Sequence, residues 1–230
     1  MARPRTHHDE KKQGIIQISF ELFMKNGYEG TSIQDIMKAA QISKGAMYHY
    51  FTCKEDILDA VLNYIIDLDK QRLEPILNDS SLTPLQKLMG AMLSGPQPPS
   101  EEVRQAAEYV MQRPASIFDY RARELSRARS IPSIANLIRE GVDAGEFHTQ
   151  YPEEMAEVMY SAAQSIGELT EQPVDMAVLR RKIDAFAKLL IYCLGLEKKD
   201  QDILLAFFND SVKPEQAQRH DNRPNKFNVD

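Results

Sequence analysis

Apolar side chains recur along the chain with the spacing of helices. The first helical face consists of Ile15, Ile16, Ser19, Phe20 and Phe23. These residues are separated by one, three, one and three positions in the sequence, which places them on one side of a helix. Asn26-Gly27 predicts the end of this helix, because glycine readily takes the left-handed conformation of a C-terminal cap. No segment shows a convincing alternation of apolar and polar residues. The pattern therefore predicts an all-α protein.

Two short helices are predicted next, with a brief turn between them. The first begins at Thr31 or Ser32, and if Thr31 is the cap, Gln34 completes a capping box. Ser43 caps the second, which covers about 44–51. Two short helices braced by a preceding helix form a helix-turn-helix, whose second helix enters the major groove of DNA.

The rest of the chain continues as helices. Their starts and ends predict helices at about 54–77, 101–112, 115–129, 133–144, 152–170, 175–196 and 200–209. Pro114 and Pro132 are expected to separate three of them, because proline has no backbone N–H for a helix interior. Glycine and prolines at 95–100 predict a loop, and the sparse apolar residues of 210–230 predict a solvated tail.

The net charge of −6 is unevenly shared along the chain. Residues 1–54 hold eight Lys and Arg against five Asp and Glu, whereas the remainder holds twenty against twenty-nine. This division suggests a small anion-binding module on a larger acidic body, with chance and a basic N-terminal arm as the alternative. Within that arm, Arg3-Pro4-Arg5 either enters a minor groove of DNA or stays a mobile tail.

The second helix of the pair carries residue types that suit contact with DNA. Lys44 and Gly45 stand at its N-terminus, where free backbone N–H groups and the helix dipole favour phosphate. Gly45 and Ala46 are small, so the backbone can come close to base edges. Tyr48 and His49 have polar tips that can reach phosphate oxygens.

A longer pattern runs from the end of the first helix to the start of the fourth. It reads Gly27-Tyr28-x-Gly30-Thr31-Ser32-Ile33-x-Asp35-Ile36, then Ala39-Ala40-x-Ile42-Ser43-Lys44-Gly45-Ala46-Met47-Tyr48-His49-Tyr50-Phe51-x-x-Lys54-Glu55-x-Ile57-Leu58. This pattern resembles the DNA-binding domain of the tetracycline-repressor (TetR) family over about residues 12–60. The resemblance implies an all-helical homodimer, in which each subunit has a three-helix N-terminal reader and a larger C-terminal domain for a small ligand and for dimerisation.

The resemblance also implies which residues of this chain contact DNA. These are Thr31, Ser32, Gln34, Lys44, Gly45, Ala46, Tyr48, His49 and Lys54. Gln34 and Lys44 are the candidates for base contact, because amide and ammonium groups can read adenine and guanine edges. Lys54 is the candidate for phosphate.

The chain departs from the family pattern at three places. Gln41 stands where a turn glycine is common, and Ala46 stands where threonine is frequent. Thr52-Cys53 replaces the usual Pro-Ser or Pro-Asn, so that Thr52 becomes an alternative cap for the fourth helix.

The two helices at about 152–170 and 175–196 have apolar residues on more than one face. Each is therefore expected to pack against its own domain and against something else. The resemblance implies that the second contact is the same pair from another subunit, in a four-helix interface, while a purely internal core is the alternative. The interface residues would be Met155, Met159, Ala162, Ile166, Leu179, Ile183, Phe186 and Leu190.

The middle helices are expected to enclose the small-molecule site that the resemblance implies. Candidate lining residues are Tyr109, Met111, Phe118, Met159 and Tyr160, each of which is otherwise a core residue. Arginines at 121, 123, 127 and 129 form a basic cluster that meets an anionic ligand, a partner acid or solvent. The sequence does not identify the ligand.

No pattern points to catalysis, a metal or a membrane span. The histidines are too scattered for a metal site, and Cys53 and Cys193 form no Cys-x-x-Cys motif. No apolar stretch approaches the roughly 20 residues of a membrane span. We expect no cofactor, no enzymatic activity and a cytoplasmic location.

These observations divide the chain into a helix-turn-helix domain at 1–54, a helical ligand-binding and dimerisation domain at 55–209 and a polar tail at 210–230. The expected function is a ligand-responsive regulator, a repressor in the first instance, that binds a palindromic DNA operator as a homodimer. A small molecule is expected to release it. The alternatives are an activator on the same fold and a helical ligand-binding protein whose reader no longer works.

Overall fold

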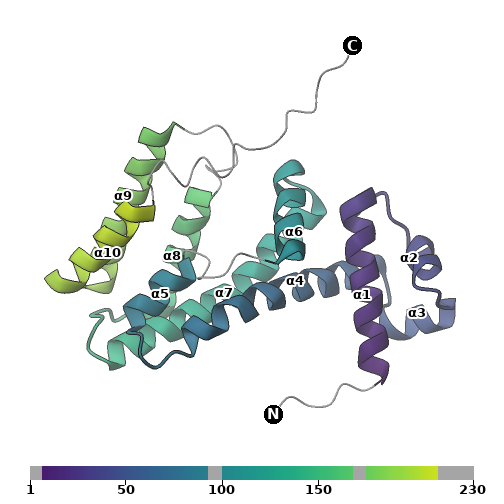
Figure 1. Ribbon diagram of the computed structural model, residues 1–230, viewed down its shortest axis with the longest axis horizontal. Coiled ribbons are helices and arrows are strands. Elements are labelled where there is room, and N and C mark those ends of the chain that lie inside the picture. The colour runs from purple at the N-terminus through teal and green to yellow at the C-terminus, as the bar shows by residue number, and fades with distance from the viewer. Residues whose placement is uncertain (1–6, 93–99, 168–174, 212–230) are drawn as a thin grey trace. The chain divides into compact units, whose positions relative to one another are not determined.

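The computed structural model describes residues 7–92, 100–167 and 175–211, and within these ranges it contains helices and no strand (Figure 1). The all-α prediction is therefore confirmed. The helices are α1 (His7–Asn26), α2 (Ile33–Ala39), α3 (Lys44–Tyr50), α4 (Lys54–Leu77), α5 (Pro84–Met92), α6 (Glu101–Gln112), α7 (Ile117–Asp143), α8 (Pro152–Gly167), α9 (Met176–Leu194) and α10 (Lys198–Ser211). The arm at Arg3-Pro4-Arg5, the loop at 95–99 and the tail beyond 211 lie outside the described residues.

The chain packs as two compact units. The first consists of Met1–Asn78 with Ser94–Arg129, and the second consists of Asp79–Leu93 with Ser130–Asp230. The first unit therefore contains α1–α4, α6 and the start of α7, while the second contains α5, the end of α7 and α8–α10. This grouping by packing differs from the sequence-based boundary at residue 54, because α4 and α6 both pack against α1.

The core of the first unit holds the reader helices from inside. Phe23 of α1, Ile36 of α2, Met47 of α3 and Ile57 of α4 are all fully buried in it. Burial of a side chain of this size contributes about 1.5–3 kcal/mol. Gly27 ends α1 with φ +81°, which confirms the predicted left-handed cap. Because the apolar faces of α2 and α3 point inward, their polar faces remain at the surface.

The arginine cluster of α7 meets acidic partners. Arg121 donates from Nε to a carboxylate oxygen of Asp59 on α4 at 3.0 Å, and Arg129 pairs with Asp67 two turns further along α4. Hydrogen bonding to Asp59 raises the pKa of the Arg121 guanidinium above its ordinary value. Arg123 pairs with an aspartate of α7 itself. A partner acid is therefore present for all three arginines, and Arg121 and Arg129 tie α7 to α4 inside the first unit.

In the second unit, α9 packs against both α8 and α10. Phe186 and Leu190 of α9 are buried, and the Phe186 ring lies 5.9 Å from the ring of Phe208 on α10. Gly195 follows α9 with φ +62°, a left-handed cap, and its N–H bonds back into the last turn. Phe147 is buried against α7, where it lies beside Gly141.

The predicted break at Pro132 is wrong, because α7 continues through it from Ile117 to Asp143. A proline inside a helix removes one backbone hydrogen bond and costs about 3 kcal/mol. Packing on both sides supplies the compensation, since Phe118 is buried in the first unit and Ile138 in the second. The proline signal was local, whereas the burial that outweighs it comes from distant parts of the chain.

Candidate DNA-reading surface

The start of α2 is fixed by Ser32. Its hydroxyl accepts the Asp35 N–H at 3.1 Å, while the Asp35 carboxylate accepts the Ser32 N–H at 2.9 Å. The carboxylate also accepts the Ser32 hydroxyl at 2.6 Å, and this bond together with the Ser32 N–H bond lowers the pKa of Asp35 below its ordinary value. The predicted box of Thr31 with Gln34 is therefore wrong. Thr31 is only 1% exposed, and its hydroxyl donates to the Gly27 carbonyl at 2.9 Å. Its side chain is therefore not accessible to DNA.

The turn between α2 and α3 contains a strained residue. Gln41 has φ +53°, the left-handed conformation that the common turn glycine would adopt without cost. The chain nevertheless closes the turn, because the Ile42 N–H bonds to the Met37 carbonyl at 3.1 Å. A non-glycine residue in this conformation costs roughly 1–3 kcal/mol.

Gln41→Gly should therefore stabilise the chain by about 0.5–1 kcal/mol, after subtraction of the extra freedom that glycine gains in the unfolded state. Urea unfolding followed by circular dichroism measures the difference. Gln41→Ala is the matched control, because it removes the same side chain but keeps the Cβ atom that causes the strain. An equal gain in both variants would show that the backbone is not the cause.

The outer face of α3 presents the predicted contact residues together. Lys44, Gly45 and His49 are exposed, and the Tyr48 side chain is 46% exposed. The Lys44 ammonium lies 5.9 Å from the centre of the Tyr48 ring, so the two polar tips share one side of the helix. No atom of the described residues comes within 4 Å of a Cβ placed on Gly45, which leaves its backbone open to a ligand.

The remaining candidates flank this face. Ser32, the cap of α2, and Gln34 in its first turn are exposed, and Ala46 is half-buried. The Lys54 ammonium lies 4.2 Å from the centre of the Tyr28 ring, a cation–π contact that holds it at the start of α4. Except for Thr31, the structure leaves every predicted DNA-contact residue at least partly accessible.

The start of α4 is organised by Asp56. Its carboxylate accepts the Thr52 N–H at 2.8 Å and also the Thr52 hydroxyl, and these bonds lower its pKa below the ordinary value. Cys53 occupies the cap position, but its side chain caps no backbone N–H of the helix. Thr52 is therefore held by the helix, and it does not cap α4 as the alternative supposed.

A buried hydrogen bond ties α6 to the turn after α1. The Tyr28 N–H donates to the Tyr109 hydroxyl at 2.9 Å, and the Tyr109 ring packs 4.8 Å from the ring of Phe118. Burial, with the carboxylate of Glu55 adding to it, raises the pKa of the Tyr28 phenol to about 12. Sequence reasoning missed this contact, because its partners lie 81 residues apart.

The candidate ligand residues fall into separate groups. Tyr109 and Phe118 belong to the core of the first unit, and Met111 on the same helix as Tyr109 is 47% exposed. Met159 is buried in the second unit, where the neighbouring Tyr160 hydroxyl accepts a hydrogen bond from Gln164 at 2.9 Å. Tyr109 and Phe118 are therefore core residues, which was the alternative to a place in the ligand site.

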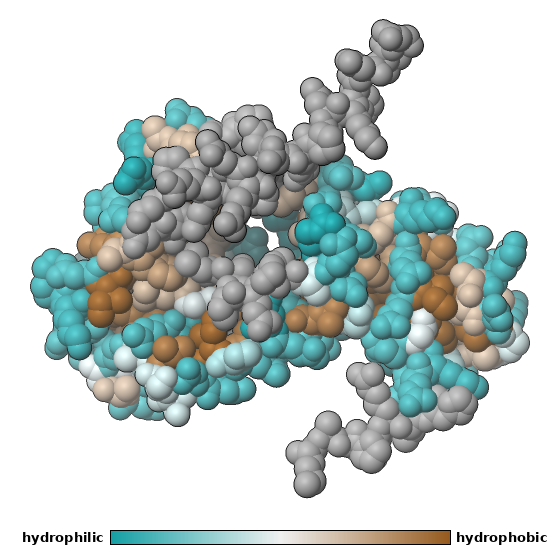
Figure 2. Space-filling view, viewed as in Figure 1, coloured by the Kyte–Doolittle hydropathy of each residue, from teal (hydrophilic) through white to brown (hydrophobic). Residues whose placement is uncertain are grey.

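None of the candidate interface residues is fully exposed. Met159, Phe186 and Leu190 are buried within the second unit, and the other five are half-buried. The apolar side chains that α8 and α9 expose are different ones, namely Val158 (41%), Met176 (44%), Val178 (43%) and Tyr192 (88%). Apolar patches are visible at the surface where Figure 1 labels α9 and α10 (Figure 2).

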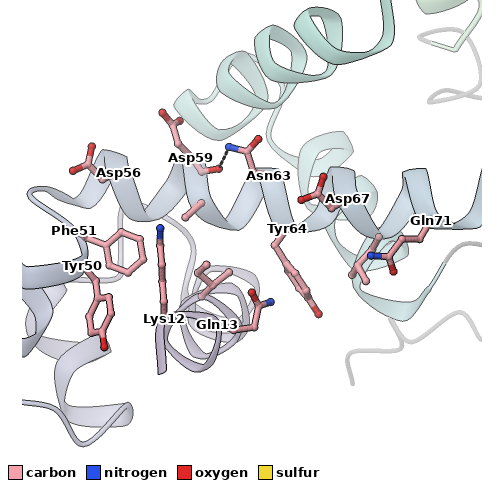
Figure 3. Close-up of a pocket in the computed structure, with 13 residues that line it drawn as sticks. Lys12, Gln13, Tyr50, Phe51, Asp56, Asp59, Asn63, Tyr64, Asp67 and Gln71 are labelled. Atoms are coloured by element: carbon pink, nitrogen blue, oxygen red, sulfur yellow. Dashed lines mark hydrogen bonds between the residues drawn. The ribbon is translucent and has the colours of Figure 1, made fainter. Parts of the chain in front are cut away.

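A groove of about 600 Å³ runs between α1 and α4 (Figure 3). Lys12 and Gln13 line it from α1, and three carboxylates line it from α4, namely Asp56, Asp59 and Asp67. Each carboxylate already accepts a hydrogen bond, from Thr52, Arg121 and Arg129 respectively. The pattern of apolar residues gave no signal for this groove, because the groove depends on how α1 packs beside α4 and mixes polar with apolar side chains.

Among the described residues, no three His, Cys, Asp or Glu side chains come together as metal ligands. The described helices also include none that is long and apolar enough to cross a bilayer.

Comparison with known sequences places the strongest likeness on this surface. Residues 15–61 match the profile of the family described as bacterial regulatory proteins, tetR family. One curated relative is the uncharacterized HTH-type transcriptional regulator YuxN of Bacillus subtilis, 35% identical over 120 residues that cover 45% of this chain and 41% of the relative. Another is the HTH-type transcriptional repressor KstR2 of Mycolicibacterium smegmatis, 31% identical over 93 residues that cover 40% and 43%. The chain thus spans less than half the length of these relatives.

Solved structures extend the likeness to the whole fold. A TetR-family regulator from Pectobacterium atrosepticum superposes with a TM-score of 0.56 at 22% identity, over 84% of this chain and 98% of that one. SmeT, the repressor of the Stenotrophomonas maltophilia multidrug efflux pump SmeDEF, superposes with a TM-score of 0.56 at 17% identity, over 82% and 92%. Both share an all-helical architecture with this chain.

Proposed function

We propose that this chain, which belongs to the tetracycline-repressor (TetR) family of bacterial transcriptional regulators, is a repressor that binds a palindromic operator as a homodimer and is released by a small molecule. The main support for this proposal is the outer face of α3, which exposes Lys44, Gly45, Tyr48 and His49 together. On the opposite face of the helix, Met47 is buried in the core. A short helix presented in this way fits the major groove. Repression is supported by the name of the relative KstR2. Such a regulator acts in the cytoplasm, where the chromosome is.

On DNA, the proposed contacts divide by chemistry. Gln34 and Lys44 read base edges, because an amide and an ammonium can bond to adenine and guanine. Ser32, Tyr48, His49 and Lys54 bond to phosphate, which fixes the register of the helix pair. Gly45 and Ala46 allow close approach of the α3 backbone. Thr31 is withdrawn from this set because it is buried.

The dimer is proposed to form through α8 and α9. A two-fold axis sets two α3 helices about one DNA turn apart, which a palindrome requires. The exposed apolar side chains of this pair, above all Tyr192 and Val158, are the candidates for the interface, and the buried residues behind them support it. Tyrosines at the centre of an interface commonly contribute 2 kcal/mol or more.

Tyr192→Asp should therefore weaken dimerisation by about tenfold or more, because it places a charge on the proposed interface. Analytical ultracentrifugation over a range of protein concentrations measures the effect. Tyr120→Asp is the matched control, since Tyr120 is also exposed, at 62%, but lies on α7 in the first unit. A dimer that weakens in the control and not in Tyr192→Asp would place the interface elsewhere.

The small molecule is proposed to bind among the helices that follow the reader, with Met159 and Tyr160 among its contacts. It must bind the DNA-free conformation more tightly than the DNA-bound one, since equal affinity shifts no population. The hydrogen bond from Tyr28 to Tyr109 gives a motion of α6 a direct path to the turn before α2.

The experiment that tests the function is selection of bound sequences from a pool of random DNA duplexes. Recovery of a palindromic motif with two equal halves supports a dimeric, sequence-specific regulator. Recovery of no motif, with all binding lost as salt rises, is the result for non-specific attraction and contradicts the proposal.

A further inference from the structure

One contact of the reading surface involves a residue outside the matched segment 15–61. Nε2 of His8, in the first turn of α1, lies 3.3 Å from Nε2 of His49 on α3. The His8 ring also packs against Tyr50, with 4.7 Å between the ring centres. Both histidines are exposed, so protons and phosphate can reach the pair. The first turn of α1 thus touches the helix that is proposed to enter the major groove.

The protonation of this pair decides whether the contact exists. Two ring nitrogens form a hydrogen bond only when one carries a proton and the other offers its lone pair. The neutral pair and the singly protonated pair both meet this condition. When both rings are charged, each Nε2 carries a proton and two positive charges face each other, so the contact is lost. Imidazole groups ordinarily change charge between about pH 5 and 8.

Charged and titratable groups lie beside the pair on both helices. On α1, a carboxylate oxygen of Asp9 lies 3.9 Å from Nδ1 of His8. Lys12 follows one turn further along α1, with its ammonium 5.8 Å from the centre of the Phe51 ring. On α3, the Tyr50 ring contacts both histidine rings.

We propose that His8 is a positioning residue for the reading surface, which holds His49 through a single shared proton and makes the affinity for DNA depend on pH. This inference rests on the proposed function, because it assigns His49 to a phosphate. A phosphate beside His49 favours the charged form of the pair. DNA binding therefore takes up one proton, and the affinity increases as the pH falls, by at most about tenfold per pH unit.

The test measures the dissociation constant for the selected duplex at about pH 6 and about pH 7.5, with EDTA present and the ionic strength fixed. We expect the wild type to bind about three- to tenfold more tightly at the lower pH. His8→Asn should reduce this difference, because His49 then lacks the imidazole that shares its proton. His49→Asn should lose it as well, and the double variant should lose no more, because the proton belongs to the pair.

His148→Asn is the matched control, because it removes an exposed imidazole from the second unit and should keep the pH difference of the wild type. A His8→Asn variant that retains the full pH difference, or single variants whose losses add up in the double variant, would overturn the proposal. Absence of specific DNA binding at either pH would contradict the proposed function instead. In that case nuclear magnetic resonance titration of the free protein still tests the shared proton, since His8→Asn should change the titration curve of His49.

Discussion

The double variant Lys44→Ala/Tyr48→Ala should bind its operator about 100-fold more weakly than the wild type, because each side chain is proposed to contribute on the order of 1–3 kcal/mol to a base or phosphate contact. Both side chains are exposed on the outer face of α3 and make no contribution to the core beneath it. The change therefore acts on DNA binding and leaves the fold intact. Fluorescence anisotropy with a labelled duplex measures it, and the loss of one ammonium should reduce the salt slope by about one.

The matched control for this variant is Lys70→Ala/Tyr120→Ala. It removes the same two side-chain types from exposed positions on α4 and α7, outside the proposed reading surface and dimer interface. The control should keep the operator affinity of the wild type. An unchanged operator affinity in Lys44→Ala/Tyr48→Ala would contradict the assignment of α3 as the helix that reads DNA.

Gly141→Ala has the largest expected effect on stability, a loss of about 3 kcal/mol at the upper end of the usual cost of overpacking. A Cβ atom on Gly141 would lie 2.1 Å from Cδ2 of the Phe147 ring, which is itself only 1% exposed. The ring cannot move away easily, because the Phe147 N–H is bonded to the Gly141 carbonyl at 3.0 Å. Urea unfolding, followed by circular dichroism, measures the loss.

The cause of this loss can be separated from a general intolerance of α7 to substitution. Phe147→Leu removes part of the ring and makes room, so adding Gly141→Ala to Phe147→Leu should cost less than adding it to the wild type. Gly45→Ala on α3 is the matched control, because nothing lies within 4 Å of a Cβ atom at that position. Additive losses in the double variant would show that the ring contact is not responsible.

Local signals in the sequence predict much of this fold. The cap at Gly27 and the position of α3 follow from short-range periodicity and capping, and the structure confirms both. The choice between Thr31 and Ser32 could not be made locally, because both carry a hydroxyl that can cap a helix. It was decided by burial, since Thr31 turns inward to the Gly27 carbonyl and leaves Ser32 at the surface.

Contacts between distant residues account for most of what sequence reasoning missed. Arg121 forms a hydrogen bond with Asp59, 62 residues away in the sequence, and Tyr109 forms one with Tyr28, 81 residues away. No periodic pattern encodes such pairs, because each depends on how whole helices pack. The contact of His8 with His49 belongs to the same class, with 41 residues between its partners. These long-range contacts connect α1, α6 and α7 to the reader helices and to α4.

The central claim is that one face of α3 reads a two-fold symmetric operator as part of a dimer. The most direct test compares the affinity for the selected palindrome with that for a duplex in which one half is scrambled, at about 50 and about 200 mM salt. Our account predicts a loss of about 100-fold or more when one half is scrambled, at both salt concentrations. Equal affinity for the two duplexes, falling together as salt rises, would contradict it.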